Sequence, residues 1–185
     1  MNNIYKNYYG DVLETFISPF TRFGKNVKLG FNVVIDKDVT IGDNVFIGHN
    51  TVIRNGVKIG NDTVIGHLVM IESDTKIGDT VTIQSQCHIT KLATIHNRVF
   101  MGPKAMCINT HNISHGRKFK AKLEGPTMEY GARIGSGAIV MPGITIGKES
   151  FLGAGAVATK DIPAFQIWMG IPAKYIKNVP EEEML

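Results

Sequence analysis

The sequence is poor in cysteine, and the cysteines it has are not spaced as a metal site. Of 185 residues only Cys87 and Cys107 are cysteines, and no Cys-x-x-Cys or paired Cys/His spacing accompanies them. The sequence therefore offers no ligand set for a structural zinc ion. Both cysteines fall at inward positions of the repeat described below, which favours buried thiols over a disulfide.

Long apolar runs are missing as well. The longest are far shorter than the roughly 18 residues that a membrane-spanning helix needs. The first residues, MNNIYKNYYGDVLE, have neither the basic nor the apolar segment of a secretory signal. We therefore expect a cytoplasmic protein with no membrane partner.

Charge is modest and has no strong bias. Charged residues make up 19% of the chain and hydrophobic residues 43%, which is typical of a folded domain. The net charge is +4, but the basic residues are dispersed apart from RKFKAK at 117–122. No nucleic-acid-binding motif accompanies them, so we expect a small phosphate-bearing ligand and no nucleic-acid partner.

What the sequence does have is a six-residue repeat. From Thr21 to Thr110 it divides into 15 hexads without a slip, such as VTIGDN, VFIGHN and VKIGND. The third residue is apolar, the first is small or β-branched, and Gly, Asn or Asp often closes the unit. Two inward residues flanking an outward one describe a short strand, and the polar end describes a tight corner. Stacked units of this kind form a parallel β-solenoid.

The repeat resembles that of the hexapeptide-repeat acyltransferases over roughly residues 21–177. The resemblance implies a left-handed parallel β-helix with three hexads per coil. The left hand comes from the resemblance, since the general crossover rule favours the opposite hand. We expect an all-β protein with an N-terminal cap at 1–20, the β-helix at 21–162 and a C-terminal segment at 163–185.

Three hexads per coil predict that residues 18 apart stack into outward ladders. In order, the three ladders are Val34, Val52, Met70, His88 and Met106; Lys28, Phe46, Val64, Thr82 and Phe100; and Arg22, Thr40, Lys58, Lys76 and Thr94. The first two are largely apolar, which predicts a partner surface. The family resemblance implies that this partner is a second copy of the chain, in a homotrimer.

The repeat lapses after Thr110 and resumes at Ala132 as ARIGSG, AIVMPG, ITIGKE, SFLGAG and AVATKD. We expect the 21 residues 111–131 to form a loop extruded between coils, with Ala132 taking the place that residue 111 would have had. Long loops on a rigid base usually carry function.

His111 opens this loop in the string INTHNIS, which looks like the histidine motif of sugar O-acetyltransferases that act on maltose or galactosides. The resemblance implies a catalytic general base. A near-neutral imidazole can take a proton from a hydroxyl or ammonium group as it attacks a thioester. A solvated loop histidine is the alternative, and either Glu124 or Glu129 is a candidate to orient the ring.

The candidate residues for acceptor binding are His88, Asn109, Asn112 and Arg117. His88 either lines the acceptor pocket or is a satisfied histidine at an interface. Arg117 belongs to a basic group that either holds a diphosphate or forms the solvated side of the loop, together with Lys118, Lys120 and Lys122.

The segments FLGAGAVATKDIP and MGIPAKYI are similar to the parts of these acetyltransferases that bind acetyl-CoA. Small outward side chains leave room for an extended pantetheine arm, and lysines suit the CoA phosphates. Without the resemblance, GAG is only a tight corner and each lysine a solvated charge. The matching cofactor-binding positions are Ser136, Ala154, Thr159, Lys160 and Lys177.

The leading hypothesis is an acetyl-CoA-dependent acetyltransferase that uses no metal. The string CHITKLATIHNRVFMGPKAMCINTHN is similar to N-acetyltransferases of nucleotide-linked amino-deoxysugars, so such an amine is the expected acceptor. One alternative is a sugar O-acetyltransferase of the maltose or galactoside type. Others are a γ-class carbonic anhydrase-like protein, whose ligand spacing differs from that of His111 and His115, and a non-enzymatic scaffold.

Overall fold

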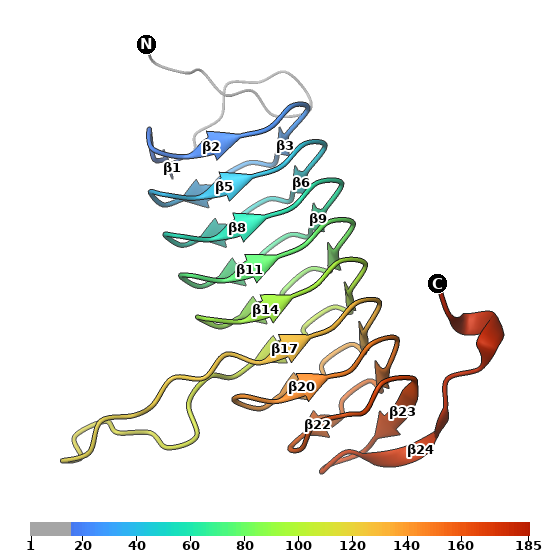
Figure 1. Ribbon diagram of the computed structural model, residues 1–185. Coiled ribbons are helices and arrows are strands. Elements are labelled where there is room, and N and C mark those ends of the chain that lie inside the picture. Colours follow the sequence, from blue (N-terminus) through green and yellow to red (C-terminus); the bar gives the residue numbers. More distant parts are fainter. Residues whose placement is uncertain (1–15) are drawn as a thin grey trace.

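Strands of mostly two residues, separated by tight corners, build residues 16–185, the part of the chain that this computed structural model describes. Three strands complete one coil, and the coils stack along one axis (Figure 1). The predicted all-β architecture, a left-handed parallel β-helix of hexapeptide repeats, is confirmed. Most of the expected N-terminal cap lies outside the described residues.

The strands form three sheets. Sheet I contains β1 (Phe16–Ile17), β4 (Val34–Ile35), β7 (Val52–Ile53), β10 (Met70–Ile71), β13 (His88–Ile89), β16 (Met106–Cys107), β19 (Ile139–Val140) and β22 (Val157–Ala158). Sheet II contains β2 (Arg22–Phe23), β5 (Thr40–Ile41), β8 (Lys58–Ile59), β11 (Lys76–Ile77), β14 (Thr94–Ile95), β17 (Thr127–Met128) and β20 (Thr145–Ile146). Sheet III contains β3 (Lys28–Leu29), β6 (Phe46–Ile47), β9 (Val64–Ile65), β12 (Thr82–Ile83), β15 (Phe100–Met101), β18 (Arg133–Ile134), β21 (Phe151–Leu152), β23 (Gln166–Met169) and β24 (Lys174–Asn178).

The ladders have the predicted register. Strands 18 residues apart pair in parallel, with Val34 opposite Val52 and Phe46 opposite Val64. The third residue of each hexad points inward, and Ile35, Ile53 and Ile71 are fully buried. Each such side chain contributes about 1.5–3 kcal/mol of burial free energy, so the aliphatic column holds the coils in line.

The corner from sheet I to sheet II, here called the I–II corner, differs from the other two. In the other corners glycine occupies the fourth hexad position at 11 of 14 places. A Cβ on Gly30, for example, would lie 2.5 Å from the backbone nitrogen of His49 in the next coil. The I–II corner has no glycine at this position and carries side chains there instead, at Asp36, Arg54, Glu72, Thr90, Ile108, Met141 and Thr159.

The loop ends earlier than the sequence predicts. Strand β17 pairs with β14 and β20, so residues 126–131 form a coil hexad and the loop covers only 111–125. Met128 is fully buried, and Gly131 takes the positive φ (67°) that closes each corner. Ala132 therefore follows β17 into sheet III. The hexad is hidden in the sequence because it begins with Pro126 and lacks the usual glycine at Glu129.

The solenoid extends at both ends beyond the expected 21–162. Strand β1 adds a rung before β4, at the N-terminal end of sheet I and within the segment expected as the cap. In the C-terminal segment, β23 continues sheet III beside β21, and β24 returns antiparallel to β23. A short 3₁₀ helix, η1 (Glu181–Glu183), follows, and Glu183 forms an ion pair with Arg133 at 3.1 Å.

Candidate active site

His111 stands at the root of the loop, directly after the I–II corner of the β16 coil. Two backbone contacts close this root, an antiparallel bridge between Thr110 and Leu123 and a 2.8 Å hydrogen bond from the Glu124 N–H to the Asn109 carbonyl. The Gly143 N–H of the next coil donates to the Glu124 carbonyl at 3.1 Å. The outgoing and returning limbs are thus joined to two coils of the solenoid, which fixes the backbone on both sides of His111.

Glu124 is the carboxylate that faces the histidine. Its Oε2 lies 3.4 Å from His111 Nε2, and its other oxygen pairs with the Lys122 ammonium. Lys122, and to a lesser degree His111, lowers the pKa of Glu124, so this carboxyl is ionised at neutral pH. Glu129, the other candidate, instead accepts the backbone N–H of Lys148 at 2.8 Å. Of the two candidates, Glu124 is therefore the one that contacts His111.

This pairing suits proton transfer. When Nε2–H is directed at Glu124, Nδ1 is the unprotonated nitrogen and can accept a proton. A carboxylate beside the ring also stabilises the imidazolium that results. The His111 side chain is 54% exposed, which leaves the ring accessible to a substrate.

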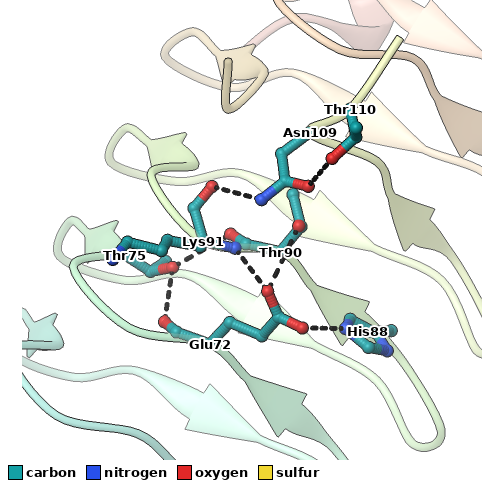
Figure 2. A network of polar contacts seen from close by, with 7 residues as sticks. All are labelled: Glu72, Thr75, His88, Thr90, Lys91, Asn109 and Thr110. Atoms are coloured by element: carbon teal, nitrogen blue, oxygen red, sulfur yellow. Dashed lines mark hydrogen bonds and ion pairs between the residues drawn. The ribbon is translucent and has the colours of Figure 1, made fainter. Parts of the chain in front are cut away.

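A polar network runs along the I–II corner below the loop (Figure 2). His88 Nε2 lies 3.1 Å from Glu72 Oε1, and Glu72 Oε2 accepts the Lys91 N–H at 2.9 Å. The Lys91 carbonyl accepts from the Asn109 amide at 3.3 Å, and Asn109 Oδ1 accepts from the Thr110 hydroxyl at 2.9 Å. The chain of contacts therefore crosses three coils and ends one residue before His111.

Glu72 is the centre of that network. Burial raises its pKa, but hydrogen bonds from the Lys91 N–H, His88 and Thr90 outweigh burial and hold the pKa below its usual value. The side chain is thus an ionised carboxylate at neutral pH, with both oxygens held in place. It lines a hollow of about 380 Å³ on the I–II corner, bounded by Arg54, Met70, Glu72, Ser73, His88 and Lys91.

The structure separates the predicted acceptor-binding residues into two kinds. His88 opens into the hollow, whereas both ends of the Asn109 amide are engaged in the network. Asn112 and Arg117 are exposed on the loop, where the Arg117 guanidinium donates to the His115 carbonyl at 2.6 Å. Asn109 therefore anchors the loop root, and the loop residues remain open to solvent.

The predicted cofactor residues lie around the C-terminal end of sheet I. Ser136 and Ala154 stack on the III–I corner, while Thr159 and Lys160 are exposed on the I–II corner. A Cβ added to Gly137 or Gly155 would meet nothing within 4 Å, so an open shelf runs beside Ser136 and Ala154. Lys177 is apart from these residues, on β24, the edge strand of sheet III. The shelf is open to solvent, and Lys160 is an exposed positive charge on the other edge of sheet I.

Sequence reasoning missed Arg54, Glu72 and Lys91. The signal was present in the repeat, because one corner in three never carries glycine at the fourth position. Side chains are tolerated where the next coil leaves room for a Cβ, and polar side chains in such a row form a lined edge. The pairing of Glu124 with His111 depends on the loop backbone and has no such signal.

None of the helices within residues 16–185 is both long and apolar enough to cross a membrane. Within the same residues no group of three or more His, Cys, Asp or Glu side chains is placed to hold a metal ion.

Comparisons with known proteins match the repeat and the fold. The profile described as "Bacterial transferase hexapeptide (six repeats)" matches residues 20–55 and 56–91, and "Hexapeptide repeat of succinyl-transferase" matches 128–160. A presumed acetyltransferase of Schizosaccharomyces pombe is 42% identical over 100 residues, which cover 49% of this chain and 45% of the relative. Galactoside O-acetyltransferase of Escherichia coli is 29% identical over 93 residues, covering 49% and 46%.

Among solved structures, UDP-N-acetylglucosamine acyltransferase from Campylobacter jejuni superposes with a TM-score of 0.62 at 18% identity, over 89% of this chain and 73% of that one. This likeness concerns the fold alone. The chain spans less than half the length of the two curated relatives. Because both profiles describe the hexapeptide repeat and together span more than half of the sequence, the chain belongs to the hexapeptide-repeat transferase family.

Proposed function

We propose that the protein is an acetyl-CoA-dependent acetyltransferase in which His111 is the general base and Glu124 orients it. The observation that carries the proposal is the 3.4 Å contact between His111 Nε2 and Glu124 Oε2 at the closed root of the loop. Acetyl-CoA supplies an activated acetyl group as a thioester. His111 takes the proton that the acceptor loses as it attacks, and Glu124 balances the charge on the ring.

The exposed shelf beside Ser136 and Ala154 is the proposed place of the pantetheine arm. Thr159 and Lys160 lie on the I–II corner, the same edge of sheet I as His111, and the shelf lies on the opposite edge. Lys160 is the proposed partner of a CoA phosphate, and Lys177 contributes only where the ligand extends to β24. Positive charge at these two positions favours an anionic ligand.

The proposed acceptor is the amino group of a nucleotide-linked amino-deoxysugar. Arg117, Lys118 and Lys120 are exposed on the loop, within reach of an acceptor that carries a diphosphate. The second candidate is a sugar hydroxyl, which is favoured by the likeness to galactoside O-acetyltransferases. A hydroxyl needs a base more than a neutral amine does, because the free amine is already nucleophilic.

We also propose that the active form is a cytoplasmic homotrimer. Apolar ladders leave Val64, Phe100 and Met106 about 40% exposed on sheets III and I of a single chain. Two apolar faces per chain suit a closed ring, in which each face meets a different face of the next copy.

The test is acetyl transfer to amino-sugar nucleotides and to simple sugars, followed by release of free thiol. His111→Ala should lower turnover by roughly 10²–10⁴-fold, the usual contribution of a positioned base. His115→Ala is the matched control, since its ring is exposed on the same loop without a carboxylate partner in the described structure, and should retain turnover. The acetyl-CoA dissociation constant should stay the same in both.

The pH dependence separates the two acceptors. For an amine, the loss in His111→Ala should shrink between pH 6 and 9, because solvent increasingly deprotonates the ammonium. A hydroxyl acceptor should show no comparable rescue. Wild-type turnover of His111→Ala at every pH would remove this residue from the mechanism.

A further inference from the structure

We propose that the hollow on the I–II corner is a subsite for a neutral sugar ring that carries neighbouring hydroxyl groups, distal to the reacting group of the acceptor. The hollow is lined by Arg54, Met70, Glu72, Ser73, His88 and Lys91. Its volume of about 380 Å³ falls within the ~300–1,000 Å³ range of small-molecule pockets. The proposal rests on the acetyltransferase function and identifies the class of group that the acceptor presents here.

The mixture of donors and acceptors identifies hydroxyls. A hydroxyl group both donates and accepts, so it is satisfied between a carboxylate and a cation. Glu72 is the fixed acceptor, while Arg54 and Lys91 are donors on either side. Met70 provides an apolar surface for the C–H face of a ring, and the Ser73 hydroxyl lies at the same wall.

A phosphate group fits this hollow poorly. The Arg54 Nε lies 3.1 Å from Asp36, and the Lys91 Nζ lies 3.1 Å from Asp74, so a carboxylate already balances the charge of each cation. Their remaining N–H groups can still donate to a neutral hydroxyl. The Glu72 carboxylate faces the same space and would repel an anion. A phosphate has only acceptor oxygens, whereas a diol can use both kinds of wall.

The carboxylate is held in position before any ligand arrives. The Lys91 N–H (2.9 Å), His88 Nε2 (3.1 Å) and the Thr90 hydroxyl (3.4 Å) contact its two oxygens. A ligand therefore has no Glu72 rotamer to order, which lowers the entropic cost of binding. The exposed lone pairs of the same oxygens remain for the ligand, since each carboxylate oxygen can accept more than one hydrogen bond.

The hollow also lies at a useful distance from the base. Glu72 precedes Ile108 by two coils on the same corner, and successive coils are separated by about 4.8 Å. A ring in the hollow is thus on the order of 5–10 Å from the loop root, the length of one sugar unit and its linkage. The reacting group of the same molecule would then reach His111.

Two sources can supply such a ring, the second sugar of a glycoside or the ribose of a ribonucleotide sugar. Four probes distinguish them: lactose, methyl β-galactoside, uridine diphosphate and thymidine diphosphate, whose sugar lacks the 2′-hydroxyl. Binding is measured by saturation-transfer NMR titration on the full chain, and acetyl transfer is measured separately. Failure of the transfer assay would refute the proposed function. The binding titrations would still show whether the hollow binds a sugar ring.

The variants are Glu72→Gln and Arg54→Gln, with Lys76→Gln on the polar face of sheet II as the matched control. Each of the first two should weaken the preferred probe about 10-fold, as expected for one hydrogen bond to a charged group. The control and His111→Ala should bind it normally. Circular dichroism shows whether Glu72→Gln is folded. If it is not, Arg54→Gln still tests the same hollow.

Preference for lactose over methyl β-galactoside supports a glycoside ring, and preference for uridine over thymidine diphosphate supports ribose. In the transfer assay the variants should raise KM and leave kcat nearly unchanged, because Glu72 does not touch the reacting atoms. Competition by pyrophosphate, equal binding by all variants, or no binding of any probe to wild type at millimolar concentration would each overturn the proposal.

Discussion

The polar ladder on the corner between sheets II and III predicts a pH-dependent stability effect at Asn61. Carboxylates and amides alternate there, with the Asp43 N–H donating to Asn61 Oδ1 at 2.9 Å and the Asn61 N–H donating to Asp79 Oδ1 at 2.7 Å. Asn97 accepts the Asp79 N–H at 2.9 Å in the next rung. The alternation keeps like charges from occupying neighbouring rungs, and Asn61→Asp would place three carboxylates in a row.

The cost follows from the spacing of the coils. Two unit charges about 4.8 Å apart repel by about 0.9 kcal/mol at the dielectric constant of water, and by more near a protein surface. The introduced carboxylate has two such neighbours, so repulsion contributes about 2 kcal/mol. The 3.2 Å hydrogen bond from Asn61 Nδ2 to Asp79 is lost as well. We expect Asn61→Asp to lower the free energy of unfolding by about 2–3 kcal/mol at neutral pH.

The sign with pH follows from the same repulsion. Neighbouring charges raise the folded-state pKa of the introduced carboxyl above its unfolded value of about 3.9. The penalty is therefore absent below about pH 3.9 and grows as pH rises through the folded-state pKa. About 1 M salt, with a screening length near 3 Å, should remove much of it at neutral pH.

Asn97→Asp is the matched control, because the rung beyond it is Tyr130 and its one carboxylate neighbour in this ladder is Asp79. Its loss should be about half as large. Urea unfolding followed by circular dichroism, at neutral and acid pH and at low and high salt, measures all four conditions. Equal losses for the two variants, or a loss for Asn61→Asp that survives acid and salt, would refute the argument from repulsion.

Three further predictions concern the site and its assembly. Glu124→Gln should lower kcat by less than the roughly 10²–10⁴-fold cost of losing the base. The loss should be the same factor at every pH from 6 to 9, because the lowered pKa of Glu124 keeps this carboxyl ionised across that range. A loss that appears only at one end of the range would contradict its role. Ala154→Phe should weaken acetyl-CoA binding in a calorimetric titration with an unchanged circular dichroism spectrum, and unchanged affinity would place the ligand elsewhere. Light scattering should report a trimer, and a monodisperse 20.3 kDa species would exclude it.

The fold could be predicted from the sequence because each hexad has the same residue types at the same positions, and these positions determine which side chains are buried and where the chain turns. A buried third position, a buried or half-buried first position and a left-handed last position recur at nearly every corner, so the register from Val34 to Met106 follows from counting. The end of the loop could not be counted, because Pro126 and Glu129 replace the residues that normally mark a hexad. The buried Met128 and the positive φ of Gly131 show that the third and last positions of this hexad kept the pattern.

The site was predictable in part. His111 became a candidate through its place after the last regular hexad and its flanking residues, and its catalytic role stays a prediction. Its contact with Glu124 depends on the bridge between Thr110 and Leu123, which pairs residues from opposite limbs of an irregular loop. No periodic pattern specifies that bridge, and the same holds for the rotamers that join Glu72 to His88.

The I–II corner, with its row of side chains, places functional groups at regular intervals along one edge of the solenoid. Its fourth positions lie on one straight edge at intervals of about 4.8 Å, and each accepts a side chain without disturbing the coil above. A polar side chain placed 18 residues later in the sequence lies one coil further along this corner, as Glu72 does relative to Arg54, and the scaffold stays the same. Under the proposed function, the length of an acceptor bound between this edge and His111 would follow from which coils carry polar groups, and substitutions along one edge would change it.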